Sequence, residues 1–189
     1  MKEIIIASAN PGKIKEYQNA LNDYKLYSMI DLGVNVEIEE TGITFQENAL
    51  IKAKALYDLY QKPVLADDSG IIVKSLPNEL GVKSKRFSKE ESDEENIRLL
   101  LKKLKNKIDR SAYFITVICL YINPFDIRYF EGRTEGLIIE HPRGKNGFGY
   151  DPIFLVNGTD KTYAELNLNE KQNLSHRGKA ITKLIRNLE

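Results

Sequence analysis

The chain has 189 residues, the length of one domain or of two small lobes that share a sheet. Hydrophobic residues make up 42% of the chain, which is enough for a packed core and too much for a disordered protein. Its 28 basic and 27 acidic side chains nearly cancel, so the chain lacks the positive field of a protein that grips nucleic-acid polymers.

The sequence predicts a cytoplasmic protein. Cys119 is its single cysteine, which excludes a disulfide within the chain and suits a reducing compartment. The first residues, MKEIIIASAN, become polar too soon for a signal peptide. No run approaches the roughly 18 apolar residues that span a bilayer, so we expect no membrane association.

Strands and helices are predicted to alternate along the first half of the chain. In chain order, we expect a strand at 3–7, a helix at 13–21, strands at 25–30 and 34–39, a helix at 44–60 and a strand at 64–73. Thr44 and Glu47 have the spacing of a capping box, which supports a helix that begins there.

The second half is predicted to contain a long hairpin between two helices. We expect a helix at 92–107, long strands at 111–123 and 126–139, a glycine-rich loop at 141–152 and a last helix at 175–188. Early alternation followed by a hairpin indicates an α/β fold with a mixed sheet.

The first polar motif is SANPGK, at residues 8–13. A strand that turns into a helix through these residues presents backbone N–H groups and one cation, Lys13, which suits a phosphate. The alternative is an ordinary turn in which Asn10 and Gly12 serve the backbone geometry alone.

The second motif is PVLADDSGIIV, at residues 63–73, which places two carboxylates in an apolar strand. Successive strand residues point to opposite faces, so Asp67 and Asp68 are expected to have different roles. Mg²⁺ takes one or two carboxylates and leaves its other positions to water and phosphates, so Glu39 or Glu40 with one aspartate would suit it. The alternative is a pair of acids that cap the following turn.

Two further motifs lie near the end of the chain. In GKNGFGYD, two glycines flank Phe148, which could stack on a nucleobase or anchor its own loop to the core. In EKQNLSHR, three cations, Lys171, His176 and Arg177, are expected to gather at the start of the last helix. Cations there oppose the helix dipole, and this local conflict favours an anion or carbonyl ligand.

The sequence lacks the residue patterns that several other kinds of catalysis require. The sequence contains no CxxC, HExxH or GxSxG motif, and His141 and His176 do not have the spacing of zinc ligands. Cys119 lies too deep in an apolar run to be a nucleophile.

Five segments in order resemble the inosine triphosphate pyrophosphatase family, which hydrolyses non-standard purine nucleoside triphosphates. They are SANPGKIKE, EETGITFQENALIKAKA, LADDSGIIV, GFGYDPIF and EKQNLSHRGKA, between residues 4 and 185. The resemblance implies one domain over 1–189 with a long, twisted mixed sheet flanked by helices, two lobes and a central substrate cleft. It also implies a homodimer.

The resemblance implies a role for each matching residue. Asp68 would be the catalytic carboxylate and would bind Mg²⁺ together with Glu39. The residues implied to bind substrate are Ser8, Ala9, Asn10, Pro11, Gly12, Lys13, Lys52, Ser69, Phe148, Gly149, Tyr150, Asp151, Lys171, His176 and Arg177. Within this set, residues 8–13 and Lys52 would bind phosphates, and Ser69 would contact the substrate. Phe148 would stack on the base, with Gly149, Tyr150 and Asp151 completing that wall. Lys171, His176 and Arg177 would read the base and close the site.

One segment departs from the family pattern. After the DDSG motif the chain reads LPNELGVKSKRF, in which Lys83 and Lys85 replace the usual Tyr and Ala. The roles of Lys85 and Arg86 therefore stay open.

The expected activity is Mg²⁺-dependent hydrolysis of ITP, dITP or XTP to the monophosphate and pyrophosphate. One rival is a related pyrophosphatase for modified pyrimidine nucleotides, against which the SHR and GFGYD segments argue. The other is a sensor that binds nucleotides without hydrolysing them, which the full set of acids and lysines disfavours.

Overall fold

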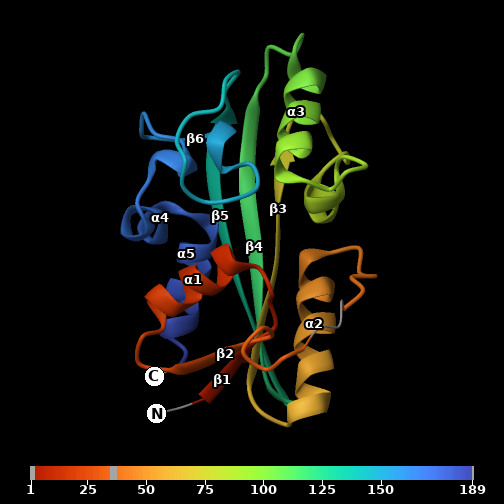
Figure 1. Cartoon of the computed structure of the whole chain (residues 1–189), viewed down its shortest axis with the longest axis vertical. Coiled ribbons are helices and arrows are strands. Elements are labelled where there is room, and N and C mark those ends of the chain that lie inside the picture. Colours follow the sequence, from red (N-terminus) through yellow and green to blue (C-terminus); the bar gives the residue numbers. More distant parts are fainter. Residues whose placement is uncertain (1–2, 35–37, 189) are drawn as a thin grey trace. The chain divides into compact units, whose positions relative to one another are not determined.

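The computed structural model describes residues 3–34 and 38–188, whose strands form one mixed sheet (Figure 1). The order across the sheet is β2-β1-β3-β4-β5-β6. β1 pairs in parallel with β2 and β3, whereas β5 and β6 pair with each other in antiparallel orientation. The strands are β1 (Glu3–Ile6), β2 (Lys25–Ser28), β3 (Val64–Val73), β4 (Ser111–Asn123), β5 (Asp126–Ile138) and β6 (Phe154–Val156).

The helices flank this sheet, as the sequence predicts. They are α1 (Pro11–Ala20), α2 (Phe45–Tyr60), α3 (Asp93–Leu104), α4 (Leu168–Leu174) and α5 (His176–Ile185). A 3₁₀ helix covers Gly81–Arg86, within the segment that departs from the family pattern. None of the helices in the described ranges combines the length and the hydropathy that a membrane span requires.

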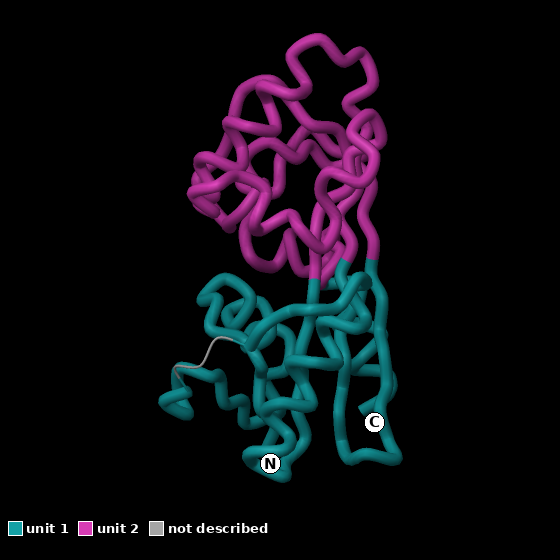
Figure 2. Tube along the Cα trace, turned by 90° about the vertical axis from the view of Figure 1, so that its right-hand side faces the viewer, with its two compact units in different colours: residues 1–68, 116–132, 178–189 teal, residues 69–115, 133–177 magenta. Residues whose placement is uncertain are grey.

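The chain divides into two compact units, coloured separately in Figure 2. Unit 1 comprises residues 1–68, 116–132 and 178–189, and unit 2 comprises residues 69–115 and 133–177. β3, β4 and β5 each contribute residues to both units. The expectation of one domain with two lobes and a central substrate cleft stays a prediction.

Unit 1 buries both faces of its part of the sheet. One face packs against α1 and α5, where Tyr17 and Ile181 are buried with Ile4 of β1. The opposite face packs against α2, where Leu56 is buried with Ile5, the next residue of β1. This alternation is the two-residue period of a strand, and Figure 1 shows the helices on either side.

Unit 2 has a separate core that is rich in aromatic rings. Phe114 of β4 contacts Phe154 and Tyr163, with ring centroids 4.8 and 5.5 Å away. Leu100 and Leu104 of α3 are fully buried in the same cluster. This core supports the loop around Phe148, because Tyr150 and Ile153, which follow that loop, are buried in it.

Local capping explains where the main helices begin. Thr44 and Glu47 form the predicted capping box of α2, and Ser92 caps α3 through the N–H of Glu95. α1 begins at Pro11, two residues before the predicted start, because proline is favoured in the first turn and Asn10 caps the helix.

Several predicted boundaries were wrong. α3 ends at Leu104 and α5 at Ile185, three residues before their predicted ends. Half of the strand predicted at 34–39 falls on residues 35–37, outside the described residues, and its other three residues are not in a strand. α4 and β6 were not predicted, because each is too short to show a clear period.

Candidate functional site

Asp67 and Asp68 point to opposite faces of β3, as the strand period predicts. Asp68 faces α2, where its Oδ2 accepts a 3.0 Å hydrogen bond from Asn48 Nδ2. Asp67 faces the other side, where its Oδ2 lies 2.9 Å from Lys13 Nζ of α1. Thr116 Oγ1 lies 3.3 Å from Asp67 Oδ2 and 3.2 Å from the carbonyl oxygen of Asp68. The two carboxylates therefore have separate partners.

The environment of Asp68 raises the pKa of its carboxyl group. Burial is the main cause, because a low dielectric disfavours the charged form. The positive charge of Lys52 opposes this shift, whereas the negative charge of Glu40 adds to it. Asp68 is thus a buried acid, and a nearby cation would stabilise its charged form.

The upstream acids differ in their surroundings. Glu40 forms an ion pair with Lys52 of α2, and both side chains are largely buried, with 20% and 12% exposure. Glu39 is exposed and has no hydrogen bond or ion pair with any described residue. The structure therefore places Glu40, one of the two acids that the residue pattern allowed, beside Lys52 and within electrostatic reach of Asp68.

The described residues around Asp68 offer a metal the carboxylate oxygens of Asp68 and Glu40. Within residues 3–34 and 38–188, no group of three or more His, Cys, Asp or Glu side chains could hold a metal ion. Two carboxylates, from Asp68 and Glu40, nevertheless fit Mg²⁺, which commonly takes its other ligands from water and substrate phosphates.

Residues 8–13 form the capped start of a helix, and two of its backbone N–H groups are hydrogen-bonded to the side chain of the cap. Asn10 Oδ1 accepts hydrogen bonds from the N–H groups of Gly12 and Lys13, at 2.9 and 3.2 Å. Ala9 and Pro11 are exposed, whereas Ser8 and Lys13 are half-buried. The cap holds this turn beside β3, where Lys13 contacts Asp67.

In unit 2, the loop that carries Phe148 is held by a buried ion pair. Lys171 Nζ of α4 lies 2.6 Å from Asp151 Oδ2, and the same oxygen accepts a 2.9 Å hydrogen bond from the N–H of Phe148. A Cβ at Gly147, whose φ is +80°, would lie 1.9 Å from Asp151 Oδ2. Only glycine fits there, because the backbone passes so close to the carboxylate.

Two cations lie near the half-buried Phe148 ring. Lys171 Nζ is 4.8 Å from the ring centroid, and the Arg177 guanidinium carbon is 5.7 Å from it. Arg177 is 1% exposed, and its Nη2 donates to Ser69 Oγ at 2.9 Å. An aromatic face with two neighbouring hydrogen-bond donors can hold a flat ring that carries acceptor atoms.

The structure corrects the predicted grouping of the late cations. Lys171 belongs to α4, whereas His176 and Arg177 begin α5. His176 is buried, and its ring stacks on Phe114 with centroids 4.7 Å apart. Tyr150 is buried as well, and its hydroxyl donates to the carbonyl oxygen of Ser84 at 2.7 Å. The side chains of His176 and Tyr150 therefore form part of the unit 2 core.

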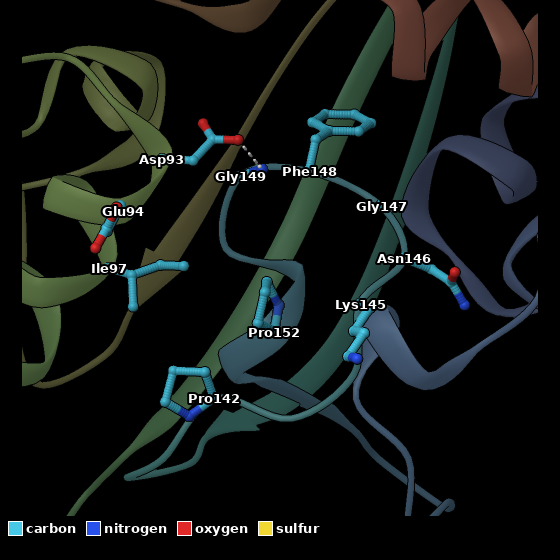
Figure 3. Close-up of a pocket in the computed structure, with 10 residues that line it drawn as sticks. All are labelled: Asp93, Glu94, Ile97, Pro142, Lys145, Asn146, Gly147, Phe148, Gly149 and Pro152. Carbon is cyan, nitrogen blue, oxygen red and sulfur yellow. Dashed lines mark hydrogen bonds between the residues drawn. The ribbon is translucent and has the colours of Figure 1, made fainter.

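A surface cavity of about 390 Å³ lies beside the Phe148 loop (Figure 3). It is lined by residues of α3, including Asp93 and Ile97, and by the 142–152 segment. Asp93 Oδ2 accepts a 2.6 Å hydrogen bond from the N–H of Gly149, drawn as the dashed line in Figure 3. The loop is thus attached to α3 on one side and to α4 on the other.

Comparison with known proteins assigns the chain to a family. The model of the Ham1 family matches residues 4–187. The chain belongs to the Ham1 family.

Relatives within the Ham1 family match almost the whole chain. A dITP/XTP pyrophosphatase from Bacillus licheniformis is 47% identical, with 97% of this chain and 96% of the relative covered. The dITP/XTP pyrophosphatase of Bacillus subtilis is 45% identical, with 100% and 98% covered. Their similarity thus extends over both units.

Solved structures of Ham1 proteins have the same fold. A HAM1 protein from Coxiella burnetii superposes with a TM-score of 0.89 at 43% identity, with 100% of this chain and 98% of that chain covered. The Ham1 protein of Staphylococcus aureus gives a TM-score of 0.87 at 43% identity, with 99% and 98% covered. The α/β fold predicted from the sequence is confirmed.

Reasoning from the sequence did not identify three polar residues of this Ham1 chain that contact predicted site residues within their own unit. Asn48 contacts Asp68, Thr116 contacts both aspartates, and Asp93 contacts the Phe148 loop. A signal for Asn48 was present, because it lies next to Ala49 on the apolar face of α2 and four residues before Lys52. Nothing comparable marked Thr116 or Asp93.

Proposed function

We propose that this chain is a pyrophosphatase that hydrolyses non-standard purine nucleoside triphosphates, namely dITP, ITP and XTP, to the monophosphate and pyrophosphate. The observation that carries the proposal is the buried Asp68 with Lys52 and Glu40 beside it, in a chain similar over its full length to dITP/XTP pyrophosphatases. The two alternatives are a pyrophosphatase for modified pyrimidine nucleotides, which would have another substrate, and a nucleotide sensor, which would bind without hydrolysis.

The residues of unit 1 suit the triphosphate. Lys52 and Lys13 would neutralise phosphate oxygens, and each is now held by an acid that orients it. Asp68 would accept a proton from the attacking water or orient that water, and its raised pKa favours proton uptake over that of an ordinary aspartate. If these lysines bind the β- and γ-phosphates as one group, the attacking water would cleave the bond between the α- and β-phosphates.

We propose that Asp68 and Glu40 hold Mg²⁺. The resemblance pointed to Glu39, but the contacts of this structure favour Glu40, which pairs with Lys52 and raises the pKa of Asp68. When bound, Mg²⁺ would supply positive charge that neutralises the triphosphate and favours the leaving pyrophosphate.

The residues of unit 2 suit the base. Phe148 would stack on the purine, and Arg177 and Lys171 would donate hydrogen bonds to its 6-keto oxygen. Tyr150, Asp151 and His176 would hold this arrangement through their contacts with Ser84, with Lys171 and the N–H of Phe148, and with Phe114. The homodimer and the cytoplasmic location stay predictions.

A panel of nucleoside triphosphates tests the proposed function. We expect dITP, ITP and XTP to be hydrolysed well above ATP and above modified pyrimidine triphosphates, with pyrophosphate as the released product. Each reaction is scored separately for pyrophosphate and orthophosphate. Release of orthophosphate with a nucleoside diphosphate would contradict the assigned reaction, and binding without turnover would favour a sensor.

Glu40→Gln and Glu39→Gln form a matched pair that tests the metal proposal. Glu40→Gln is expected to raise the Mg²⁺ concentration for half-maximal activity by roughly 10-fold or more, the scale seen when groups that support a metal site are removed. Glu39→Gln should leave this concentration near that of the unchanged protein, because Glu39 is exposed. Mg²⁺ titrations of activity measure both, and the reverse pattern would assign the metal to Glu39.

A further inference from the structure

Asn48 is a fully buried amide that uses both ends of its side chain. It lies in the first turn of α2 with 0% exposure. Its Oδ1 accepts a 2.8 Å hydrogen bond from the N–H of Gly42, and its Nδ2 donates to Asp68 Oδ2 at 3.0 Å. The side chain therefore joins the segment before α2 to the buried carboxylate of β3.

The chemistry of the partners determines the orientation of this amide. The N–H of Gly42 can only donate, and the Asp68 carboxylate, when ionised, can only accept. Rotating the amide by 180° would oppose two donors at Gly42 and two acceptors at Asp68. The contact is thus specific for an asparagine held in one orientation.

The approach of Gly42 to α2 leaves no room for a side chain. A Cβ at Gly42 would lie 2.7 Å from Asn48 Oδ1 and 2.6 Å from Glu47 Cβ. Glu47 also accepts hydrogen bonds from the N–H groups of Ile43 and Thr44, at 2.7 and 3.1 Å. The segment that carries Glu40, two residues earlier, is therefore attached to the start of α2 at consecutive N–H groups.

A neutral donor suits a carboxylate that must keep its charge. Lys52 and Lys13 lower the pKa of Asp68 by their positive charge, whereas Asn48 lowers it by a hydrogen bond and adds no charge. Such a bond can restrict the rotation of the carboxylate about Cβ–Cγ without neutralising it. Fixing a reacting group in this way is how supporting residues contribute to catalysis.

We infer that Asn48 is a positioning residue, which fixes the orientation of the Asp68 carboxylate and links it to the Glu40 segment through Gly42. The inference rests on the proposed catalytic role of Asp68. Asn48 itself is not expected to contact the substrate, because both ends of its amide are already bonded to Gly42 and Asp68.

Asn96 provides a matched control within the same chain. It is also a buried asparagine of a helix, with 3% exposure, and also uses both ends of its amide. Its Oδ1 accepts from the N–H of Ser88 at 2.7 Å, and its Nδ2 donates to the carbonyl oxygen of Lys85 at 2.9 Å. Asn96→Ala thus removes the same number of hydrogen bonds from α3, with a neutral carbonyl oxygen as acceptor in place of the Asp68 carboxylate.

Asn48→Ala is expected to lower kcat for dITP by about 10- to 100-fold with KM changed less than about threefold, because a displaced carboxylate reacts slowly but phosphates are still bound. Asn96→Ala should lower the melting temperature comparably and leave kcat within about twofold. Equal losses of kcat in the two variants would show that Asn48 is merely structural and would overturn the inference.

Gly42→Ala disturbs the same contact at its other partner, Gly42. This variant provides the test if Asn48→Ala does not fold. The φ of Gly42 is not in the left-handed region, so alanine tests the clash with Asn48 and Glu47 alone. We expect kcat to fall with KM nearly unchanged, and normal kcat in this variant would contradict the inference. In Asn48→Ala, hydrogen exchange at the Gly42 N–H should also accelerate, which NMR measures without any substrate.

A double-mutant cycle with Asp68→Ala separates the inference from the function on which it rests. If Asn48 acts through Asp68, Asn48→Ala should cause little further loss of kcat once Asp68 is absent. An undiminished further loss would show that Asn48 acts independently of Asp68 and would overturn the inference alone. Near-normal turnover in Asp68→Ala itself would overturn the catalytic role of Asp68 and, with it, the inference.

Discussion

Asp68→Asn is expected to reduce turnover of dITP by about 10²-fold or more while the protein stays folded. This is the usual scale of loss for a general acid or base. The substitution keeps the shape of the side chain and removes its charge. The amide can turn its oxygen toward Asn48 Nδ2, so the existing 3.0 Å hydrogen bond is retained.

The melting temperature provides a control for Asp68→Asn. Because burial raises the pKa of Asp68, its charged form is less favourable in the folded chain than in the unfolded chain. Near neutral pH, where the unfolded aspartate is ionised, asparagine avoids this cost. The melting temperature should therefore equal or exceed that of the unchanged protein, as is common when a charged active-site group is removed.

Turnover and thermal melting, measured on the same preparation, decide the prediction for Asp68. A folded variant that hydrolyses dITP at a near-normal rate would exclude Asp68 from the chemistry. A variant with low turnover and a strongly lowered melting temperature would indicate that Asp68 is needed for folding, contrary to the expectation.

Arg177→Ala is expected to reduce the preference for ITP over ATP by roughly 5- to 150-fold, which corresponds to an unpaired buried group worth about 1–3 kcal/mol. Hypoxanthine carries a 6-keto acceptor, whereas adenine carries a 6-amino donor. Arginine can only donate, so a buried guanidinium opposite adenine would lose its partner. Alanine removes this discrimination.

The ratio of kcat/KM for ITP and ATP is a suitable measurement for Arg177→Ala, because replacing a buried residue can also lower the amount of folded protein. Arg177 is 1% exposed and donates to Ser69, so its removal is expected to lower stability as well. The ratio of kcat/KM for ITP and ATP is unaffected by the fraction of folded protein, because both substrates meet the same sample. A lower ratio therefore reports on base recognition alone.

Phe148→Leu is the matched control for Arg177→Ala. Stacking does not read the edge of the base, so loss of the ring should weaken all purine substrates alike. Comparable reduction of ITP and ATP hydrolysis by Arg177→Ala would show that Arg177 does not read the 6-position.

Much of this site could be predicted from the sequence wherever a local rule applies. The two-residue period of a strand placed Asp67 and Asp68 on opposite faces, and the structure confirms their separate partners. Capping-box spacing at Thr44 placed the start of α2, and with it the helix that carries Lys52. The ordered motifs identified the family, since five short segments in one order rarely coincide by chance.

Tertiary structure decided the contacts between segments that are distant along the chain. Glu39 and Glu40 are indistinguishable in the sequence, and only packing against α2 turned Glu40 toward Lys52. His176 and Tyr150 were expected at a binding surface, but the aromatic core of unit 2 took up both side chains. Asn48 acquires its role only because folding brings Gly42 and Asp68 to its two ends. Periodicity and capping follow from geometry within a few residues, whereas burial and pairing depend on which distant segments meet.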